Sequence, residues 1–272
     1  MLAPLGGLTV LDQSDLDLRD AERIREAVRA ASPDVIVNAA AYTAVDKAES
    51  DRDTAFAINA AAPGVLADEA KRKGVLLVHY STDYVFDGAK ATPYVEDDAP
   101  NPLNVYGASK LAGDRAIAAS GCRHLILRTS WVYGPRGSNF MLTMLRLARE
   151  RPELRVVDDQ VGAPTSSRAI ARATATALAC AVQSPELTGL YHLTAGGETS
   201  WCGFARAILS RAGIATPVLP IHTEGYPTPA RRPRNSRLDC SRLRAAFGVT
   251  LDPWEEGLAE AMTERARLSR AE

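Results

Sequence analysis

The chain of 272 residues is long enough to bury a substantial core, as one large domain or as two closely packed ones. Its 46% hydrophobic and 24% charged residues are typical of a globular protein, and a net charge of −1 argues against nucleic-acid or anionic-lipid partners. No apolar run approaches the roughly 18 residues of a membrane span. The first residues also carry no export pattern. We therefore expect no nucleic-acid partner and no membrane partner.

Cysteines and histidines are scattered along the sequence rather than paired. Disulfide frameworks and zinc sites normally cluster their ligands, and no C-x-x-C pair occurs here. We expect no metal site, and we interpret the residues as buried thiols and ordinary histidines of a protein in the reducing cytoplasm. They are Cys122, Cys180, Cys202, Cys240, His79, His124, His192 and His222.

The first half of the chain alternates short β-branched runs with helical patterns. The predicted strands are Leu8 to Leu11, Val35 to Val37, Val75 to His79 and Leu125 to Arg128. The predicted helices are Asp20 to Ala31, Thr54 to Lys73, Tyr106 to Ala119 and Asn139 to Glu150. This alternation predicts an α/β fold: a Rossmann-like, doubly wound parallel sheet with helices on both faces. Such sheets bind ligands beyond the carboxyl ends of their strands.

After about residue 152 the alternation weakens and prolines and glycines become frequent. Helices are still indicated near residues 167–182, 201–211 and 254–266. We predict a dinucleotide-binding domain over residues 1–152. A smaller substrate-binding lobe over residues 153–272 would return some segments to the first domain.

The chemistry points to Tyr106, Lys110 and Thr82. A ketone reductase must protonate the developing alkoxide, and a lysine ammonium close to a tyrosine phenol lowers the phenol's pKa toward neutrality. Tyr106 and Lys110 lie one helical turn apart and so share one face of the predicted helix. Thr82 follows the preceding strand and could polarise the same carbonyl. The tyrosine–lysine spacing alone is common by chance, so the flanking segments decide.

Long stretches carry a resemblance to a known family. They are Pro33 to Glu49, His79 to Phe86, Pro102 to Gly107, Arg128 to Tyr133, Asp159 to Thr165, Gly189 to Leu193, Tyr226 to Ala230 and Asn235 to Leu238. In these stretches the chain resembles the extended short-chain dehydrogenase/reductases and, more closely, the dTDP-4-dehydrorhamnose reductases. The resemblance runs from about Leu2 to Glu264, nearly the whole chain.

The resemblance implies NAD(P)H-dependent reduction of the 4-keto group of dTDP-4-dehydro-L-rhamnose, a small nucleotide-sugar. By it Tyr106 is the proton donor, Lys110 its partner and a ribose ligand, and Thr82 the carbonyl contact. The implied cofactor ligands are Asp17, Leu18, Ala39, Ala40, Ala41, Tyr42, Thr43, Ser81, Tyr106 and Lys110. The implied substrate contacts are Thr82, Asp83, Trp131 and Arg232, the last in a basic loop whose arginines suit a diphosphate.

One expected element does not occur in the sequence. A dinucleotide-binding fold begins with a strand, a glycine-rich turn and a helix whose amides hold the pyrophosphate. By the resemblance, Leu8 to Leu11 is the family's second strand, so we expect the chain to be an incomplete form that lacks roughly 20 residues of the first strand–helix unit. If the chain is complete as it stands, we expect its cofactor affinity to be severely weakened.

Several alternatives stay open. Another dTDP-4-keto sugar would suit the same residues. Two other interpretations are a non-catalytic subunit, resembling the regulatory subunit of methionine adenosyltransferase, and an inactive truncated product. The sequence does not distinguish NADPH from NADH. The resemblance also implies a homodimer and a magnesium requirement. The sequence identifies neither the residues of a dimer interface nor the magnesium ligands.

Overall fold

The computed structural model describes residues 1–268, and its centre is a parallel sheet. The strands lie in the order β1 (Val35–Asn38), β2 (Leu76–Thr82), β3 (His124–Thr129) and β8 (Gly189–His192). Every neighbouring pair is parallel, with Asn38 opposite His79 and Thr82 opposite Thr129. The carboxyl ends of β1, β2 and β3 therefore meet at one edge, as the sequence predicts.

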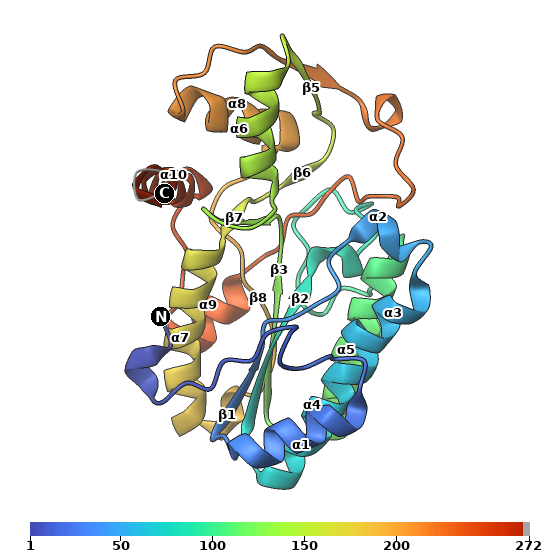
Figure 1. Cartoon of the computed structure of the whole chain (residues 1–272), viewed down its shortest axis with the longest axis vertical. Helices are drawn as coiled ribbons and strands as arrows, with labels where there is room; N and C mark the ends of the chain where they lie inside the picture. Colours follow the sequence, from blue (N-terminus) through green and yellow to red (C-terminus); the bar gives the residue numbers. More distant parts are fainter. Residues whose placement is uncertain (269–272) are drawn as a thin grey trace.

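Helices cover both faces of this sheet (Figure 1). Along β2 the side chains alternate: Leu77 packs with the helices of one face, and Leu76 and Val78 pack with those of the other. The first face carries α1 (Ala21–Ala31), α4 (Ala62–Lys73) and α5 (Val105–Ser120). The second face carries α7 (Ser167–Gln183) and α9 (Ser241–Phe247). This arrangement confirms the doubly wound α/β fold.

Shorter elements lie around the sheet. They are η1 (Ala3–Leu5), α2 (Val45–Ala48), α3 (Arg52–Phe56), the π-helical turn η2 (Ala57–Ala61), η3 (Asp83–Val85) and η4 (Pro185–Leu187). The predicted helix Thr54 to Lys73 is present as the continuous run α3, η2 and α4.

A second lobe lies above the sheet in Figure 1 and has its own apolar core. Its elements are β4 (Val132–Tyr133), α6 (Phe140–Glu150), β5 (Leu154–Val157), β6 (Val161–Gly162), β7 (Thr165–Ser166), β9 (Thr199–Ser200), α8 (Trp201–Arg211), β10 (Val218–Ile221), η5 (Thr223–Gly225) and α10 (Trp254–Leu268). The core joins Met141 and Met144 of α6 to Phe204 and Ile208 of α8. Helix α6 thus packs with this lobe, although the predicted boundary at residue 152 leaves it in the first domain.

The predicted strand Leu8 to Leu11 is wrong. The segment has no strand pairing, and Leu8 and Val10 are 56% and 78% exposed. A strand needs a hydrogen-bonded neighbour, and no described residues pair with this segment or with the outer edge of β1. None of the helices in residues 1–268 has the length and apolar character that a bilayer span requires.

Candidate active site

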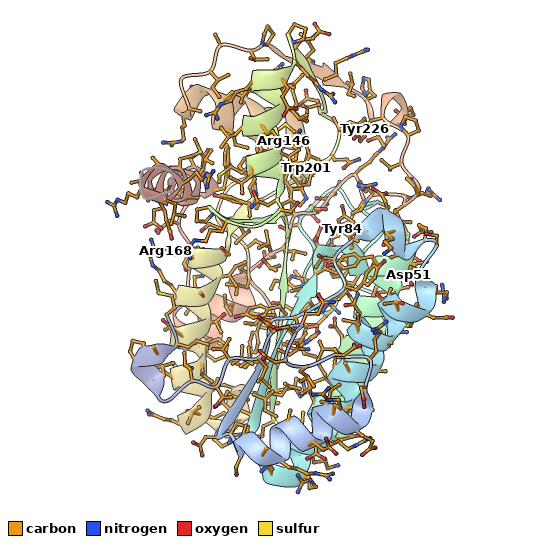
Figure 2. All side chains as sticks on the ribbon, in the orientation of Figure 1. Asp51, Tyr84, Arg146, Arg168, Trp201 and Tyr226 are labelled. Carbon is orange, nitrogen blue, oxygen red and sulfur yellow. The ribbon has the colours of Figure 1, made fainter. Side chains whose placement is uncertain are left out.

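The site begins where β2 ends and α5 approaches it. Thr82 ends the strand, and its hydroxyl caps η3 by accepting a hydrogen bond of 3.2 Å from the Tyr84 amide. Helix α5 comes so close that a Cβ on Gly107 would lie 2.1 Å from the Tyr84 carbonyl oxygen. Tyr106 consequently packs edge-on against Tyr84, with ring centroids 5.7 Å apart. Figure 2 shows Tyr84 where the sheet meets the second lobe, with Trp201 and Tyr226 above it.

Tyr106 and Thr82 lie together, as the sequence predicts. The Thr82 hydroxyl acts on the Tyr106 phenol and lowers its pKa, but burial outweighs this effect and raises the pKa to about 12. Lys110 is not among the groups that shift the pKa of Tyr106 in this structure, so its expected effect on that pKa stays a prediction. At neutral pH the phenol keeps its proton, as a proton donor must.

The Lys110 ammonium is turned toward β2 rather than toward the phenol. It donates to the Tyr80 carbonyl oxygen at 2.6 Å, and its Nζ lies 3.0 Å from His79 Nε2. Burial lowers the pKa of Lys110 to about 8, while the negative charge of Asp114 opposes the shift. Burial and the Lys110 charge together push the pKa of His79 well below its usual range. Buried polar atoms need partners, and these two acceptors are the nearest ones to the ammonium.

A buried ion pair supports this corner of the site, and sequence reasoning did not find it. Asp114, one turn after Lys110 on α5, accepts hydrogen bonds from the Ser81 hydroxyl at 3.0 Å and from Arg128 Nε at 3.2 Å. The side chains of Arg128 and Asp114 are 3% and 6% exposed. The signal that could have found Asp114 is its i, i+4 spacing from Lys110.

The loop after β1 carries half of the predicted cofactor ligands, Ala39 to Thr43. It is fixed by Asn59, which accepts a bond of 2.8 Å from the Tyr42 amide and donates one of 3.0 Å to the Tyr42 carbonyl. Asn59 also donates to the Ser109 hydroxyl at 3.0 Å, next to Lys110. Asn59 lies in the π-helical turn η2, a feature often found at functional sites. Nothing in the local sequence pattern indicates a π turn, so the sequence does not predict this role of Asn59.

Asp17 and Leu18 lie in the segment just before α1. Asp17 is paired with Arg19, whose hydrogen bonds lower the pKa of Asp17 to about 2. Leu18 packs with the helices of the first sheet face. Within residues 1–268 neither residue shares a hydrogen bond or ion pair with Thr82, Tyr106 or Lys110.

A cavity of about 440 Å³ is lined by the segment that follows η3 and by residues of the later loop, and Thr82, Tyr106 and Lys110 are not part of its lining. One wall is the segment after η3 together with Leu103, and the other is the basic loop that contains Arg231, Arg232 and Arg234. Arg232 is held in place: its guanidinium bonds Asp46 of α2 at 2.8 Å and 3.1 Å, and Thr228 at 2.6 Å. These bonds outweigh burial and raise the pKa of Arg232.

Trp131 lies deep in the second lobe, 8% exposed, in a left-handed backbone conformation with φ of 48°. Such a conformation is strained for a bulky residue and persists only when its surroundings hold it. Its ring stacks on Trp201 with centroids 3.7 Å apart. A Cβ on Gly162 would lie 2.7 Å from the same ring, so this glycine makes room for the stack.

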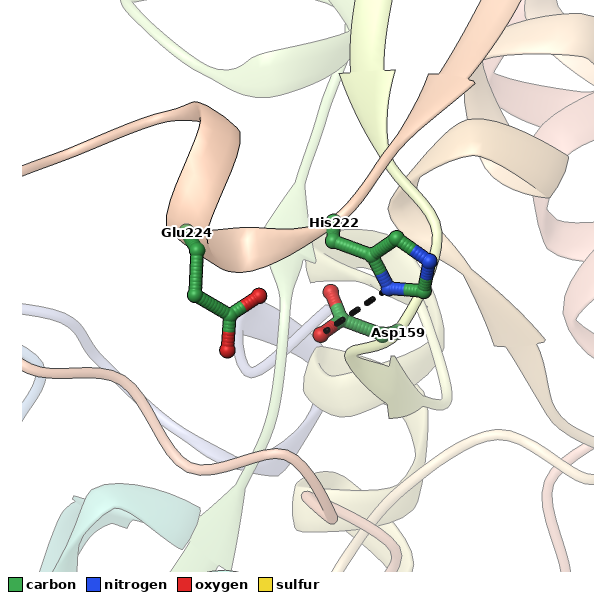
Figure 3. A group of neighbouring side chains, drawn as sticks. All are labelled: Asp159, His222 and Glu224. Atoms are coloured by element: carbon green, nitrogen blue, oxygen red, sulfur yellow. Dashed lines mark ion pairs between the residues drawn. The ribbon is translucent and has the colours of Figure 1, made fainter.

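Asp159, His222 and Glu224 form a small group near the cavity, with ligand-type atoms within 4.8 Å of one another (Figure 3). His222 Nδ1 is 3.8 Å from Asp159 Oδ2. Arg234 already compensates the two carboxylates, with Nη2 2.8 Å from Glu224 and Nε 4.0 Å from Asp159. The group therefore ties the loop after β5 to η5 as an ion-paired cluster.

Parallel strands with a tyrosine and a lysine on one helix beside their carboxyl ends define a Rossmann-like short-chain dehydrogenase/reductase. The family profile described as the RmlD substrate binding domain matches residues 2–267. The chain belongs to this family.

Named relatives agree with this assignment. A dTDP-4-dehydrorhamnose reductase of Burkholderia thailandensis is 50% identical over 265 residues, covering 93% of this chain and 89% of that protein. Its counterpart from Shigella flexneri is 47% identical over 273 residues, covering 97% and 91%. The crystal structure of dTDP-4-dehydrorhamnose reductase from Bacillus anthracis in complex with NADP superposes with a TM-score of 0.91 at 36% identity, covering 97% of this chain and 92% of that one.

Proposed function

We propose that the protein reduces the 4-keto group of dTDP-4-dehydro-L-rhamnose to give dTDP-L-rhamnose. Its family and its relatives, which carry the name dTDP-4-dehydrorhamnose reductase at 50% and 47% identity, support the substrate. The observation that carries the chemistry is the pairing of Tyr106 with Thr82 at the carboxyl end of β2. Both hydroxyls would lie against one carbonyl oxygen.

We further propose NADPH as the hydride donor, with NADH as the alternative. The NADP complex of the Bacillus anthracis protein supports this choice. The residues present fit the nicotinamide half of the cofactor: Lys110, Ser81 and the loop held by Asn59 all lie at the carboxyl ends of β1 and β2. When bound, the cofactor supplies the hydride. Ala39 to Thr43, Ser81, Tyr106 and Lys110 would hold it, with Asp17 and Leu18 toward the adenine.

The chain's own residues handle the oxygen and its proton. Thr82 donates a hydrogen bond to the substrate oxygen, where negative charge develops. The Tyr106 phenol, with a pKa of about 12, is protonated before reaction and passes its proton to the alkoxide. The buried Lys110 ammonium keeps a positive charge beside the site.

The diphosphate end of the nucleotide-sugar would occupy the cavity lined by the basic loop with Arg232, since arginine forks are suited to a diphosphate. The sugar would extend from there to Thr82 and Tyr106, with Asp83 and Trp131 as its further contacts. We also propose a cytoplasmic location, which the four free thiols support. A homodimer stays a prediction, which light scattering would test. A magnesium requirement also stays a prediction, which assays with and without EDTA would test.

Cofactor oxidation in the presence of the dTDP-4-keto sugar tests the proposal. We expect Tyr106→Phe to lower kcat at least about 100-fold, because a positioned general acid contributes that much. Tyr133→Phe is the matched control. Its hydroxyl is buried in the second lobe without a hydrogen-bond partner among the described residues, so its loss should leave turnover unchanged. Equal rates for wild type and Tyr106→Phe would remove Tyr106 from the mechanism.

A further inference from the structure

Asn104 lies at the start of α5, two residues before Tyr106, and is only 7% exposed. Its Oδ1 accepts a hydrogen bond of 2.8 Å from the Gly107 amide and so caps the helix. Its Nδ2 donates a hydrogen bond of 2.7 Å to the carbonyl oxygen of Arg231, which lies 127 residues later in the basic loop. One side chain therefore binds both the helix that carries Tyr106 and the loop that lines the cavity.

The cap by itself does not require an amide side chain. Serine and aspartate cap helices about as well as asparagine, because each offers one oxygen to the free amides of the first turn. The Nδ2 group of Asn104 adds nothing to the cap, since it donates to the Arg231 carbonyl outside α5. That second bond instead fixes the basic loop against the first turn of the helix.

Helix α2 supports both sides of this contact. Asp46 of α2 accepts a hydrogen bond of 3.2 Å from the Ala230 amide, just before the arginines of the basic loop. Glu49, which caps the end of the same helix, accepts one of 2.8 Å from the Val105 amide, at the first residue of α5. The basic loop, α2 and the first turn of α5 thus form a closed ring of hydrogen bonds, in which Asn104 joins the loop directly to α5.

The two segments that Asn104 joins have different tasks in the proposed reaction. The basic loop with Arg232 would hold the diphosphate, and Tyr106, the second residue of α5, would donate the proton. We propose that Asn104 is a positioning residue, which couples a diphosphate on the basic loop to the placement of the Tyr106 phenol. A diphosphate that orders the loop also fixes the first turn of α5, so binding energy remote from the ketone is used in the proton-transfer step. This inference rests on the proposed reductase function.

Two substitutions remove this link and retain the cap. Asn104→Ser is shorter, neutral and without a second polar atom, whereas Asn104→Asp keeps the shape but places an acceptor against the Arg231 carbonyl oxygen. We expect each variant to lower kcat for cofactor oxidation with the dTDP-4-keto sugar at least about fivefold. We also expect each to weaken dTDP binding, measured by calorimetry, at least about fivefold, because the loop loses its anchor on α5.

Asn139 supplies the matched controls, because its side chain makes the same two kinds of bond in the second lobe. It caps α6 by accepting a hydrogen bond of 3.2 Å from the Leu142 amide, and it donates one of 2.9 Å to the Gly134 carbonyl oxygen. Asn139→Ser and Asn139→Asp should therefore lose as much stability in urea as the Asn104 variants, but keep wild-type kcat and dTDP affinity. A purely structural role of Asn104 would leave kcat the same in all four variants.

Hydrogen exchange measures the coupling without turnover. In the wild-type protein, saturating dTDP should slow exchange at least about fivefold both in the basic loop and at the Gly107 amide, which the Asn104 side chain holds. In Asn104→Ser and Asn104→Asp the protection should stay in the basic loop and no longer reach Gly107.

Outcomes against the coupling are distinct from failure of the proposed function. Exchange at Gly107 that does not respond to dTDP in an active wild-type enzyme overturns the coupling alone. So does a change in only one of kcat and dTDP affinity, or a defect in Asn104→Asp that is absent from Asn104→Ser, since the added charge would then be its cause. A wild-type protein that oxidises no cofactor with any dTDP-4-keto sugar overturns the proposed function itself, and with it the catalytic use of the coupling.

Discussion

Gly107 allows α5 to begin directly against η3. Its Cβ position is 2.1 Å from the Tyr84 carbonyl oxygen and 3.1 Å from the Pro102 Cβ, so any side chain there forces the helix away from β2. We expect Gly107→Ala to lower the free energy of unfolding by about 1–3 kcal/mol through this clash. Ketoreduction should fall as well, because Tyr106 moves with the helix.

Gly64→Ala is the matched control, since this glycine is also helical but its Cβ would make an ordinary contact of 3.4 Å with Ala116. It should stabilise the protein by up to about 1 kcal/mol through helix propensity. Urea denaturation monitored by circular dichroism measures both changes. A Gly107→Ala protein as stable as wild type would refute the close-contact argument.

At this same residue scale the sequence identified Tyr106 and Thr82 but not the partner of Lys110. Helical spacing fixes which face a side chain leaves from, not the rotamer that it adopts. The ammonium follows the nearest buried acceptors, His79 and the Tyr80 carbonyl. Asn59 and Asp114 act through contacts distant in sequence, which a local pattern does not contain.

Helices α1 and α4 are joined by a buried carboxylate whose charge has a clear consequence for stability. Glu69 of α4 is 3% exposed and bonds Arg72 of its own helix and Arg29 of α1. The Arg72 hydrogen bond is the largest of the effects that lower the pKa of Glu69 to about 2. A depressed carboxyl pKa stabilises the fold above the unfolded pKa, and that stability is lost as pH falls through the folded pKa.

We therefore expect Glu69→Gln to cost about 1–2 kcal/mol at neutral pH, discounting for the half-exposed arginines. The difference between wild type and Glu69→Gln should shrink as pH falls from the unfolded value near 4.5 toward about 2. Chemical denaturation at several pH values measures it. A difference that stays constant with pH would exclude the charged pairing as its source.

Elements with a strong periodic signal were predicted within a few residues. The helix expected at Asp20 to Ala31 is Ala21–Ala31, because Ile24 and Val28 mark its buried face and Asp20 caps it. The strand expected at Leu8 to Leu11 does not form, although its composition is suitable. Strand formation depends on a neighbour in space, and residue composition carries no information on whether that neighbour is present.

At the scale of the whole molecule, the division into two lobes is only partly sequential. Helix α7 and strand β8 return to the sheet from beyond residue 152, while α6, which lies before residue 152, packs in the second lobe. The domain limits 1–152 and 153–272 stay a prediction, which limited proteolysis would test. Any motion between the lobes would change the cavity that they share.

One ion pair connects the lobes beside that cavity. Asp46 of α2 receives two bonds from the Arg232 guanidinium and one of 3.2 Å from the Ala230 amide, and the Arg232 bonds lower the pKa of Asp46. Asp46→Asn weakens this ion pair without removing Arg232 itself. We expect dTDP to bind about tenfold more weakly, because the basic loop must then be ordered at the expense of binding energy.

The same variant should leave kcat unchanged, since Asp46 touches none of the proton-transfer groups. The loss of stability should stay below about 1 kcal/mol, because the pair is partly exposed. Arg172→Ala is the control: it breaks an exposed ion pair with Glu260 that lies outside the cavity lining. Calorimetric titration with dTDP compares the two. Equal dTDP affinity in Asp46→Asn and Arg172→Ala would mean that the basic loop is ordered by its own contacts. The ion pair between Asp46 and Arg232 would then not preorganise the site.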